Sequence, residues 1–169
     1  MTDNEQNVIF KKWVSQHKGL IFKILRAYAF TPMDQDDLFQ EITIQVWHSI
    51  PSFRQESAVT TWIYRVALNT AIKWIGKERK HNQPEALDAA QHFLREGKEQ
   101  IDERLSWLYE EIHKMDEIDR SIALLLLDGF SYKEMASMLG ITESNVGVKI
   151  NRIKKQLISK SKKYDYHGI

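Results

Sequence analysis

The chain has 169 residues, 24 of them basic and 23 acidic, with 43% hydrophobic residues and no cysteine. This length allows one ordinary domain or two small ones, the hydrophobic share excludes wholesale disorder, and the missing cysteines exclude disulfides and thiolate metal sites. The longest aliphatic run, residues 122–127, is far shorter than the ~20 residues that span a bilayer, and the polar N-terminus is unlike a signal peptide, so we expect a soluble, cytoplasmic protein.

The formal net charge of +1 is a cancellation between three blocks. Residues 1–80 carry 11 bases and 8 acids, residues 81–140 carry 6 and 13, and residues 141–169 carry 7 and 2, so the net charges are +3, −7 and +5. Because local patches steer a polyanion more than the total does, the two basic blocks are compatible with nucleic-acid binding. Solvated helix faces would give the same counts, and that alternative stays open.

Apolar residues recur at helical spacing in the N-terminal half, and strand-like alternation is hard to find, which predicts an all-α fold. One long helix is expected over residues 8–30 and a second over 34–48, with Asp34 as its N-cap. Residues 51–57 are predicted to form a loop. A third helix should follow over residues 60–79.

A polar stretch at residues 83–100 contains a proline and a glycine and is predicted to be a flexible linker, with a short helix at 86–95. A second helical block should begin near Ile101. The predicted architecture is therefore two small helical domains, residues 1–82 and 101–169, joined by the linker.

The strongest local motif is a predicted helix-turn-helix near the C-terminus. Gly129 would end the preceding helix, and Ser131 with Glu134 forms a capping box that opens a short helix. Gly140 permits a sharp turn, and Thr142 can cap the next helix. In this geometry the second helix enters the major groove of DNA, whereas the alternative is a helical hairpin used for protein contact.

On a helical wheel, the second helix of this motif divides into two faces. Its core-facing stripe is predicted to consist of Val146, Ile150, Ile153 and Leu157. The opposite side presents hydroxyl, amide, cationic and small apolar groups, which suit base edges and phosphates. Its outward residues are Ser144, Val148, Asn151 and Lys155, flanked by Asn145 and Arg152, with Lys149 directed to the DNA backbone.

Three stretches of the first predicted domain, taken in chain order, fit a recognisable sequence pattern. Residues 34–47 (DQDDLFQEITIQVW) fit the pattern D-x-x-D-L-x-Q-E-x-x-x-x-x-W, Phe53-Arg54 follows, and residues 61–69 read TWIYRVALN. Together with the helix-turn-helix, they resemble bacterial RNA polymerase sigma factors of the sigma-70 family. The third stretch looks like the W-L-Y-R-I-A-x-N stretch of the extracytoplasmic-function (ECF) class, which keeps two of the conserved domains. The resemblance covers roughly residues 8–80 and 101–160.

The resemblance implies a subunit that binds core RNA polymerase, directs it to promoters and helps to open DNA at the minus-ten element. Residues 1–82 would be a region 2-like domain and residues 101–169 a region 4-like domain. The acidic segment would contact the clamp helices of the largest polymerase subunit, where it would complement a basic surface. An alternative explanation of these acidic residues is that their negative charges compensate the helix dipole at the N-terminus. The contacts implied are Asp34, Asp37, Leu38, Gln40 and Glu41.

For the minus-ten element, the resemblance implies contacts from the third helix and from the loop before it. That loop corresponds to one that captures a base flipped from the stack, so a shaped pocket and cations must offset the unstacking. Asn69 and Lys73 lie one helical turn apart and would meet the nontemplate strand. The further contacts implied are Phe53, Arg54, Gln55, Ser57, Arg65, Lys77, Arg79 and Lys80.

The region 4-like domain would bind the minus-thirty-five element and the flap of the second largest polymerase subunit. The chain departs from the family at Gly147, since Val146-Gly147-Val148-Lys149 stands where V-K-S-R is common. Gly147 removes a cation and costs up to ~1 kcal/mol of helix propensity. The resemblance also implies inhibition by an anti-sigma factor, often membrane-anchored, which would hold the protein at the inner membrane.

The sequence contains no phosphate-binding glycine loop, and its six histidines show no ligand spacing. We therefore predict a protein that is not an enzyme and needs no cofactor, metal or small-molecule substrate. Two other hypotheses remain, a regulator that binds duplex DNA without joining polymerase and a helical protein-interaction module. Residues 34–41 and 53–58 favour the sigma factor over the regulator, and the basic face at 144–155 opposes the module.

Overall fold

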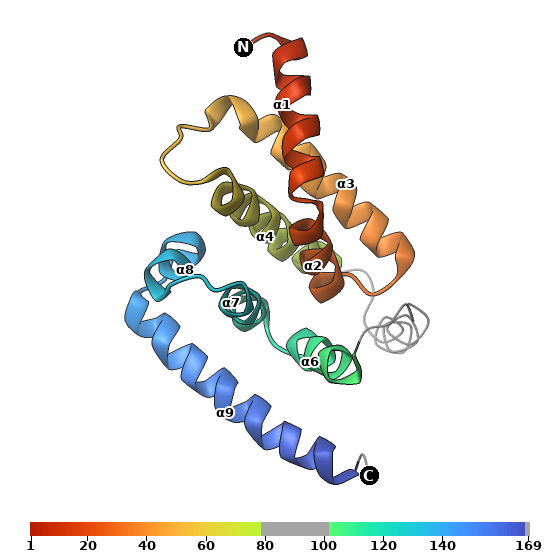
Figure 1. Ribbon diagram of the computed structural model, residues 1–169, viewed down its shortest axis with the longest axis vertical. Coiled ribbons are helices and arrows are strands. Elements are labelled where there is room, and N and C mark those ends of the chain that lie inside the picture. Colours follow the sequence, from red (N-terminus) through yellow and green to blue (C-terminus); the bar gives the residue numbers. More distant parts are fainter. Residues whose placement is uncertain (79–101, 168–169) are drawn as a thin grey trace. The chain divides into compact units, whose positions relative to one another are not determined.

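A computed structural model describes residues 1–78 and 102–167 of the chain, and all regular structure in these two ranges is helical. The chain divides into two compact units, Met1–Asp102 and Glu103–Ile169 (Figure 1). The predicted all-α, two-unit fold class is confirmed. The predicted linker, its short helix at 86–95 and the first residues of the second block lie outside the described residues.

The first unit is a bundle in which α2, α3 and α4 pack against one another and α1 lies against α3 (Figure 1). Its core consists of aliphatic side chains at helical spacing, such as Ile24 of α2, Ile42 of α3 and Leu68 of α4, each at most 1% exposed. The elements are α1 (Asp3–Gln16), α2 (Lys18–Tyr28), α3 (Pro32–Ser49), the 3-10 helix η1 (Ile50–Ser52) and α4 (Val59–Glu78).

The single helix predicted over residues 8–30 is wrong, because the chain breaks at His17. There φ is −109° and ψ is 17°, which ends α1 and begins α2. The imidazole stabilises the break, since its Nδ1 lies 2.7 Å from the carbonyl oxygen of Trp13 and its Nε2 lies 3.0 Å from Oγ1 of Thr60 in the first turn of α4. Both helices carry apolar residues at helical spacing, so periodicity alone could not reveal the joint.

The N-terminus of α3 also differs from the prediction. Thr31, not Asp34, is the N-cap, and its Oγ1 accepts a 3.0 Å hydrogen bond from the backbone N–H of Asp34. Pro32 occupies the first helical position, where its missing N–H costs nothing and its fixed φ suits the helix. Asp34 stands in the first turn, where its negative charge is stabilised by the helix dipole.

The second unit consists of four helices in the described part of the chain. The long α9 packs against α7 and α8, and α6 packs against α7. Arg120 of α7 is 2% exposed and donates to the carbonyl oxygens of His113 (2.7 Å) and Met115 (3.0 Å), which fixes the turn between α6 and α7. The elements are α6 (Glu103–His113), α7 (Glu117–Leu127), α8 (Tyr132–Leu139) and α9 (Glu143–His167).

The predicted helix-turn-helix is confirmed by α8 and α9. Gly129, with φ of 79°, follows the end of α7, and the capping box of Ser131 and Glu134 opens α8 with bonds of 2.7 and 3.1 Å. Gly140 adopts φ of 68° in the turn, a left-handed conformation that glycine adopts without steric cost. Oγ1 of Thr142 then accepts a 3.1 Å bond from the N–H of Asn145 at the start of α9.

Candidate polymerase and DNA interfaces

The acidic segment predicted to contact a partner lies along α3. Asp37 and Gln40 are exposed, and Asp34 and Glu41 are half-buried, so all four side chains reach solvent. Leu38 is 0% exposed and belongs to the core of the first unit. Its predicted partner contact is therefore corrected, because a side chain buried between helices has no surface to offer.

A groove of about 450 Å³ runs between α3 and α4. Its α3 side includes Asp37 and Glu41, and its α4 side includes the predicted DNA contacts Asn69, Lys73 and Lys77. The sequence predicts different partners for these two sets of residues and gives no sign that they lie together. In the fold they line one groove, so an acidic wall faces a basic one.

On α4, the predicted DNA contacts form one exposed stripe. Arg65, Asn69, Lys73 and Lys77 are all exposed and recur every four residues, which keeps them on neighbouring turns of one face. The opposite side of the helix is buried, including Tyr64, which is 1% exposed. Arg79 and Lys80 lie outside the described residues.

The loop before α4 is anchored by an aromatic cluster. The ring of Phe53 lies 5.2 Å from the rings of both Trp13 and Trp62, measured between centroids, and Trp13 and Trp62 are 5.5 Å apart. Edge-to-face pairs of this kind stabilise by about 0.5–1.5 kcal/mol beyond the area that they bury. Phe53 is half-buried and its ring packs on the two tryptophans, while Arg54 and Gln55 are exposed.

Two further features of this loop bear on recognition. Gln55 has φ of 59°, the only positive φ among the described non-glycine residues, and this conformation turns the backbone sharply. Ser57 is exposed two residues later. Of the four predicted loop contacts, the structure leaves Arg54, Gln55 and Ser57 accessible and uses Phe53 as the anchor.

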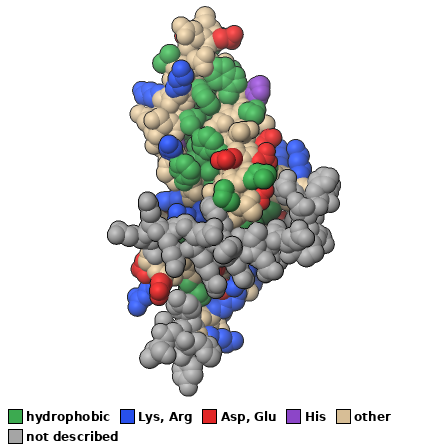
Figure 2. All heavy atoms as spheres, turned by 90° about the vertical axis from the view of Figure 1, so that its right-hand side faces the viewer, with side chains coloured by type: hydrophobic (Ala, Val, Ile, Leu, Met, Phe, Trp, Pro, Cys, Tyr) green, Lys and Arg blue, Asp and Glu red, His purple; other side chains and the backbone are tan. Residues whose placement is uncertain are grey.

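One face of the first unit carries hydrophobic side chains with acidic ones between them (Figure 2). The exposed large hydrophobic residues of this unit include Phe22 (48%), Met33 (79%) and Ile44 (48%). Phe22 stacks on Phe39 of α3 at 6.2 Å between ring centroids. A surface that combines exposed apolar groups with acids is suited to a protein partner whose surface is apolar and basic.

The predicted reading face of α9 is exposed. Val146, Ile150 and Ile153 are buried at no more than 1% exposure, as predicted, whereas Leu157 is only half-buried. The residues that point the other way are exposed, and Val148 is 65% exposed, which leaves an apolar side chain available to a thymine methyl. The exposed residues on this side are Ser144, Asn145, Val148, Asn151 and Lys155.

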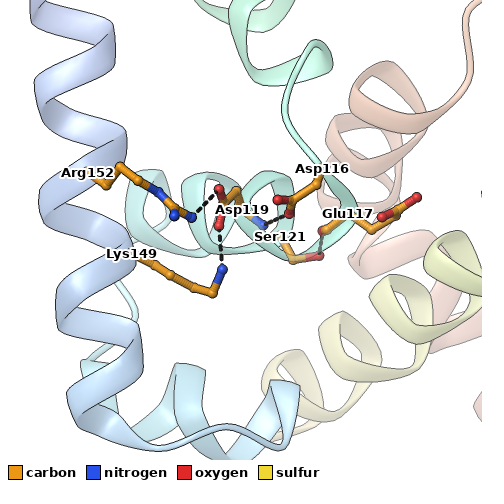
Figure 3. A network of polar contacts seen from close by, with 6 residues as sticks. All are labelled: Asp116, Glu117, Asp119, Ser121, Lys149 and Arg152. Carbon is orange, nitrogen blue, oxygen red and sulfur yellow. Dashed lines mark hydrogen bonds and ion pairs between the residues drawn. The ribbon is translucent and has the colours of Figure 1, made fainter.

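The structure gives Lys149 and Arg152 a different environment from the rest of the predicted DNA contacts (Figure 3). Lys149 Nζ lies 2.9 Å from Oδ1 of Asp119, and Arg152 Nη2 lies 2.9 Å from Oδ2 of the same carboxylate. Asp119 stands on α7, and its side chain is only 10% exposed. No pattern in the sequence points to Asp119, because the two pairs join residues 30 and 33 positions apart.

A second acid holds the later part of α9. The carboxylate of Glu111 on α6 accepts hydrogen bonds from Lys114 Nζ (2.9 Å) and from Lys160 Nζ (2.6 Å). Burial raises the pKa of the Glu111 carboxyl, but the bonds from the two ammonium groups outweigh it and hold the pKa below 4.5. The carboxylate therefore stays charged at neutral pH.

The described part of the chain offers neither a cluster of metal ligands nor a membrane-spanning helix. No cluster of three or more histidine, cysteine, aspartate or glutamate side chains there is arranged to hold a metal ion. Within those same residues, no helix has the length and apolar character needed to cross a membrane.

An exposed reading helix in one unit, and an acidic helix beside a basic one in the other, are features of a DNA-binding protein that also docks on a protein. Two family profiles agree with these features: Sigma-70 region 2 matches residues 13–81, and Sigma-70, region 4 matches residues 105–157. The chain belongs to the sigma-70 family of RNA polymerase sigma factors, and it binds core polymerase and directs it to promoters.

Relatives place the chain near the ECF class, as predicted. It is 29% identical over 164 residues to the ECF RNA polymerase sigma-E factor of Haemophilus influenzae, covering 89% of this chain and 86% of the relative. It is also 29% identical over 140 residues to the factor of the same name from Escherichia coli K12, covering 75% and 73%. By family, the protein is a transcription initiation factor.

Two solved structures share the fold. The sigma factor RpoE, in complex with the anti-sigma factor NepR from Bartonella quintana, superposes with a TM-score of 0.68 at 15% identity, covering 90% of this chain and 96% of that one. CnrH, in complex with the cytosolic domain of CnrY, gives a TM-score of 0.63 at 19% identity, covering 90% and 87%. At these identities the comparison establishes the arrangement of helices.

Proposed function

We propose that this sigma factor divides its work between the two units. The first unit, within residues 1–82, contacts the clamp helices of core polymerase through Asp34, Asp37, Gln40 and Glu41 and the minus-ten element through α4. The second unit, within residues 101–169, contacts the minus-thirty-five element through α9. The observation that carries the proposal is the groove between α3 and α4, which is acidic on one wall and basic on the other.

The first unit helps to open the DNA at the minus-ten element. Flipping a base out of the stack costs a few kcal/mol, which a pocket and nearby cations must offset. A loop held by the aromatic cluster around Phe53 supplies a fixed support, and the exposed Arg54, Gln55 and Ser57 supply hydrogen bonds. The stripe Arg65, Asn69, Lys73 and Lys77 then holds the nontemplate strand. Arg79 and Lys80, which lie outside the described residues, are further DNA contacts of this proposal.

The second unit reads duplex DNA with an outward face that is largely uncharged. Ser144, Asn145 and Asn151 can donate to and accept from base edges, and Val148 offers an apolar contact. Lys155 adds a cation for phosphate. This unit also contacts the flap of the second largest polymerase subunit.

An anti-sigma factor holds this sigma factor inactive. Support comes from the two structural neighbours, whose structures are complexes with NepR and with the cytosolic domain of CnrY. A membrane-anchored inhibitor of this kind would keep the sigma factor, itself cytoplasmic, at the inner membrane until a signal releases it. The protein is not itself an enzyme, since catalysis resides in the polymerase.

Run-off transcription tests the proposal. Core polymerase is combined with a library of promoter templates, with and without the full chain, and the transcripts are sequenced. The proposal requires transcripts with a defined start that appear only when the protein is present, together with co-purification of the protein and core polymerase. The absence of both results would refute it, and duplex binding without co-purification would favour a simple regulator.

A further inference from the structure

One carboxylate in the second unit holds two cations of the recognition helix. Figure 3 shows Lys149 and Arg152 reaching from α9 to Asp119 on α7, each with a separate oxygen at 2.9 Å. The backbone of Asp119 is held in place, because its N–H donates a 2.9 Å bond to Oδ1 of Asp116, the N-cap of α7. Asp119 thus lies in the first turn of a capped helix that belongs to the core of the unit.

Lys149 and Arg152 lie on a different side of α9 from the outward-facing residues. On the wheel of α9, Lys149 lies only 60° from the buried Val146, whereas Lys155 lies opposite that residue. The side chain of Lys149 is accordingly 20% exposed, because it runs along the packed side of the helix towards α7. Arg152 lies at the border and is 53% exposed, but its Nη2 is also turned to Asp119.

Cations on a recognition helix raise the affinity for DNA of any sequence and so lower the selectivity for one sequence. Each cation that neutralises a phosphate raises the affinity for every sequence equally and adds about 0.9 to the slope of log K against log salt concentration. Base-edge contacts from uncharged groups raise the affinity for the right sequence only. A helix that keeps some cations from phosphates therefore discriminates better between promoter and bulk DNA.

We propose that Asp119 is a positioning residue that sets promoter specificity by holding Lys149 and Arg152 against α7, away from DNA phosphates. The inference rests on the proposed DNA contact of α9. It makes Asp119, which touches no DNA, a determinant of the ratio between specific and non-specific binding. Discrimination is then carried by the uncharged groups Ser144, Asn145, Val148 and Asn151.

The test measures binding of the full chain to a fluorescent duplex of random sequence over a series of salt concentrations. Asp119→Asn keeps the size of the side chain and removes its charge. The expected result is tighter non-specific binding and a salt slope steeper by up to about 1.8, two cations at about 0.9 each. Adding Lys149→Gln and Arg152→Gln to this variant should return the slope to the wild-type value.

Controls separate this effect from a general change of charge or fold. Glu103→Gln removes one acid at an exposed position of α6 and should leave the slope unchanged. Circular dichroism checks that each variant is folded. An unchanged or shallower slope in folded Asp119→Asn, or a steeper slope in Glu103→Gln, overturns the proposal.

A measurement on the wild-type protein covers the case in which Asp119→Asn does not fold. Lysines are acetylated with and without the duplex, and their modification is followed by mass spectrometry. Lys155 should become protected when DNA is added, whereas the low reactivity of Lys149 should stay the same. Equal protection of both lysines by DNA overturns the inference. If Lys155 gains no protection, it is the proposed DNA contact of α9 that fails.

Discussion

The indole Nε1 of Trp74 donates a 2.7 Å hydrogen bond to Oδ2 of Asp37 and so joins α4 to α3. Trp74 is 8% exposed, while the carboxylate of Asp37 lies at the surface. The side chain of Asp37 thus takes part both in the contact between the two helices and in the surface proposed to bind polymerase. The bond gives the two helices a fixed relative position at the groove between them.

Trp74→Phe should destabilise the first unit by about 1–2 kcal/mol, because it removes a hydrogen bond to a charged acceptor while it keeps an aromatic ring in the core. Chemical denaturation followed by circular dichroism measures the loss. Trp62→Phe is the matched control, since that ring takes part in aromatic contacts that a phenyl group can retain. Equal losses in the two variants would show that ring size, rather than the hydrogen bond, accounts for the effect.

Asp37→Arg should abolish binding to core polymerase, since it places a cation where a basic surface is expected. Asp37→Asn keeps an acceptor for the indole and should weaken core binding only partly. Co-purification with core polymerase measures both, and binding of the full chain to minus-thirty-five duplex serves as the internal control that should not change. Loss of duplex binding in Asp37→Arg would contradict the proposed division of work between the units.

Glu111→Gln should lower the stability of the second unit by about 1 kcal/mol at pH 7, where the carboxylate is charged and bonded to two ammonium groups. The pKa of Glu111 is lower in the folded state than its usual value of 4.5, so its contribution is present above about that pH and is lost as the pH falls through the folded pKa. Wild-type stability should therefore converge on that of Glu111→Gln on acidification. Urea denaturation at several pH values tests this, and a constant difference down to low pH would contradict it.

Lys155→Ala should weaken binding to minus-thirty-five duplex and reduce the salt slope by about 0.9, the value for one phosphate contact. Lys155 is exposed at the centre of the proposed reading face of α9. Lys12→Ala removes an exposed lysine from α1 of the other unit and should leave this binding unchanged. Equal effects of the two variants would mean that the lysines act only through total charge.

Gly147→Ala and Gly140→Ala should change stability in opposite directions. A Cβ at Gly147 would meet the ring of Tyr132 at 3.6 Å, an ordinary contact, so alanine should stabilise α9 by up to ~1 kcal/mol through helix propensity. Gly140 has φ of 68°, where alanine costs about 1–2 kcal/mol. Thermal unfolding measures both changes. Destabilisation by Gly147→Ala would show that packing against Tyr132 requires a glycine at this position.

The features that the sequence predicted well depend on neighbours in the chain. The capping box at Ser131, the left-handed turn at Gly140 and the cap at Thr142 each involve residues three to four positions apart, so residue type and spacing suffice. The buried stripe of α9 likewise follows from helical periodicity. These local signals were enough for the fold class and for the location of the helix-turn-helix.

What the sequence missed depends on contacts between distant residues. The break at His17 is stabilised by Thr60, 43 positions away, and the capture of Lys149 by Asp119 spans 30. Leu38 was assigned to a partner because a motif contains it, although its place on α3 buries it in the core. A motif shows which residues recur together, but only the packing shows which of them reach the surface.

The 25 residues of α9 form a rod of about 37 Å, at 1.5 Å per residue. Among the side chains of α9 that the structure describes, which end at Lys163, Ile153 is the last buried one. Amide protons from Gly147 to Ile153 should therefore exchange with solvent mainly when the whole unit opens, whereas those in the last turns should exchange by local fraying. A partner that covers the C-terminal end of α9 should therefore slow amide exchange there before it changes exchange in the buried part of the helix.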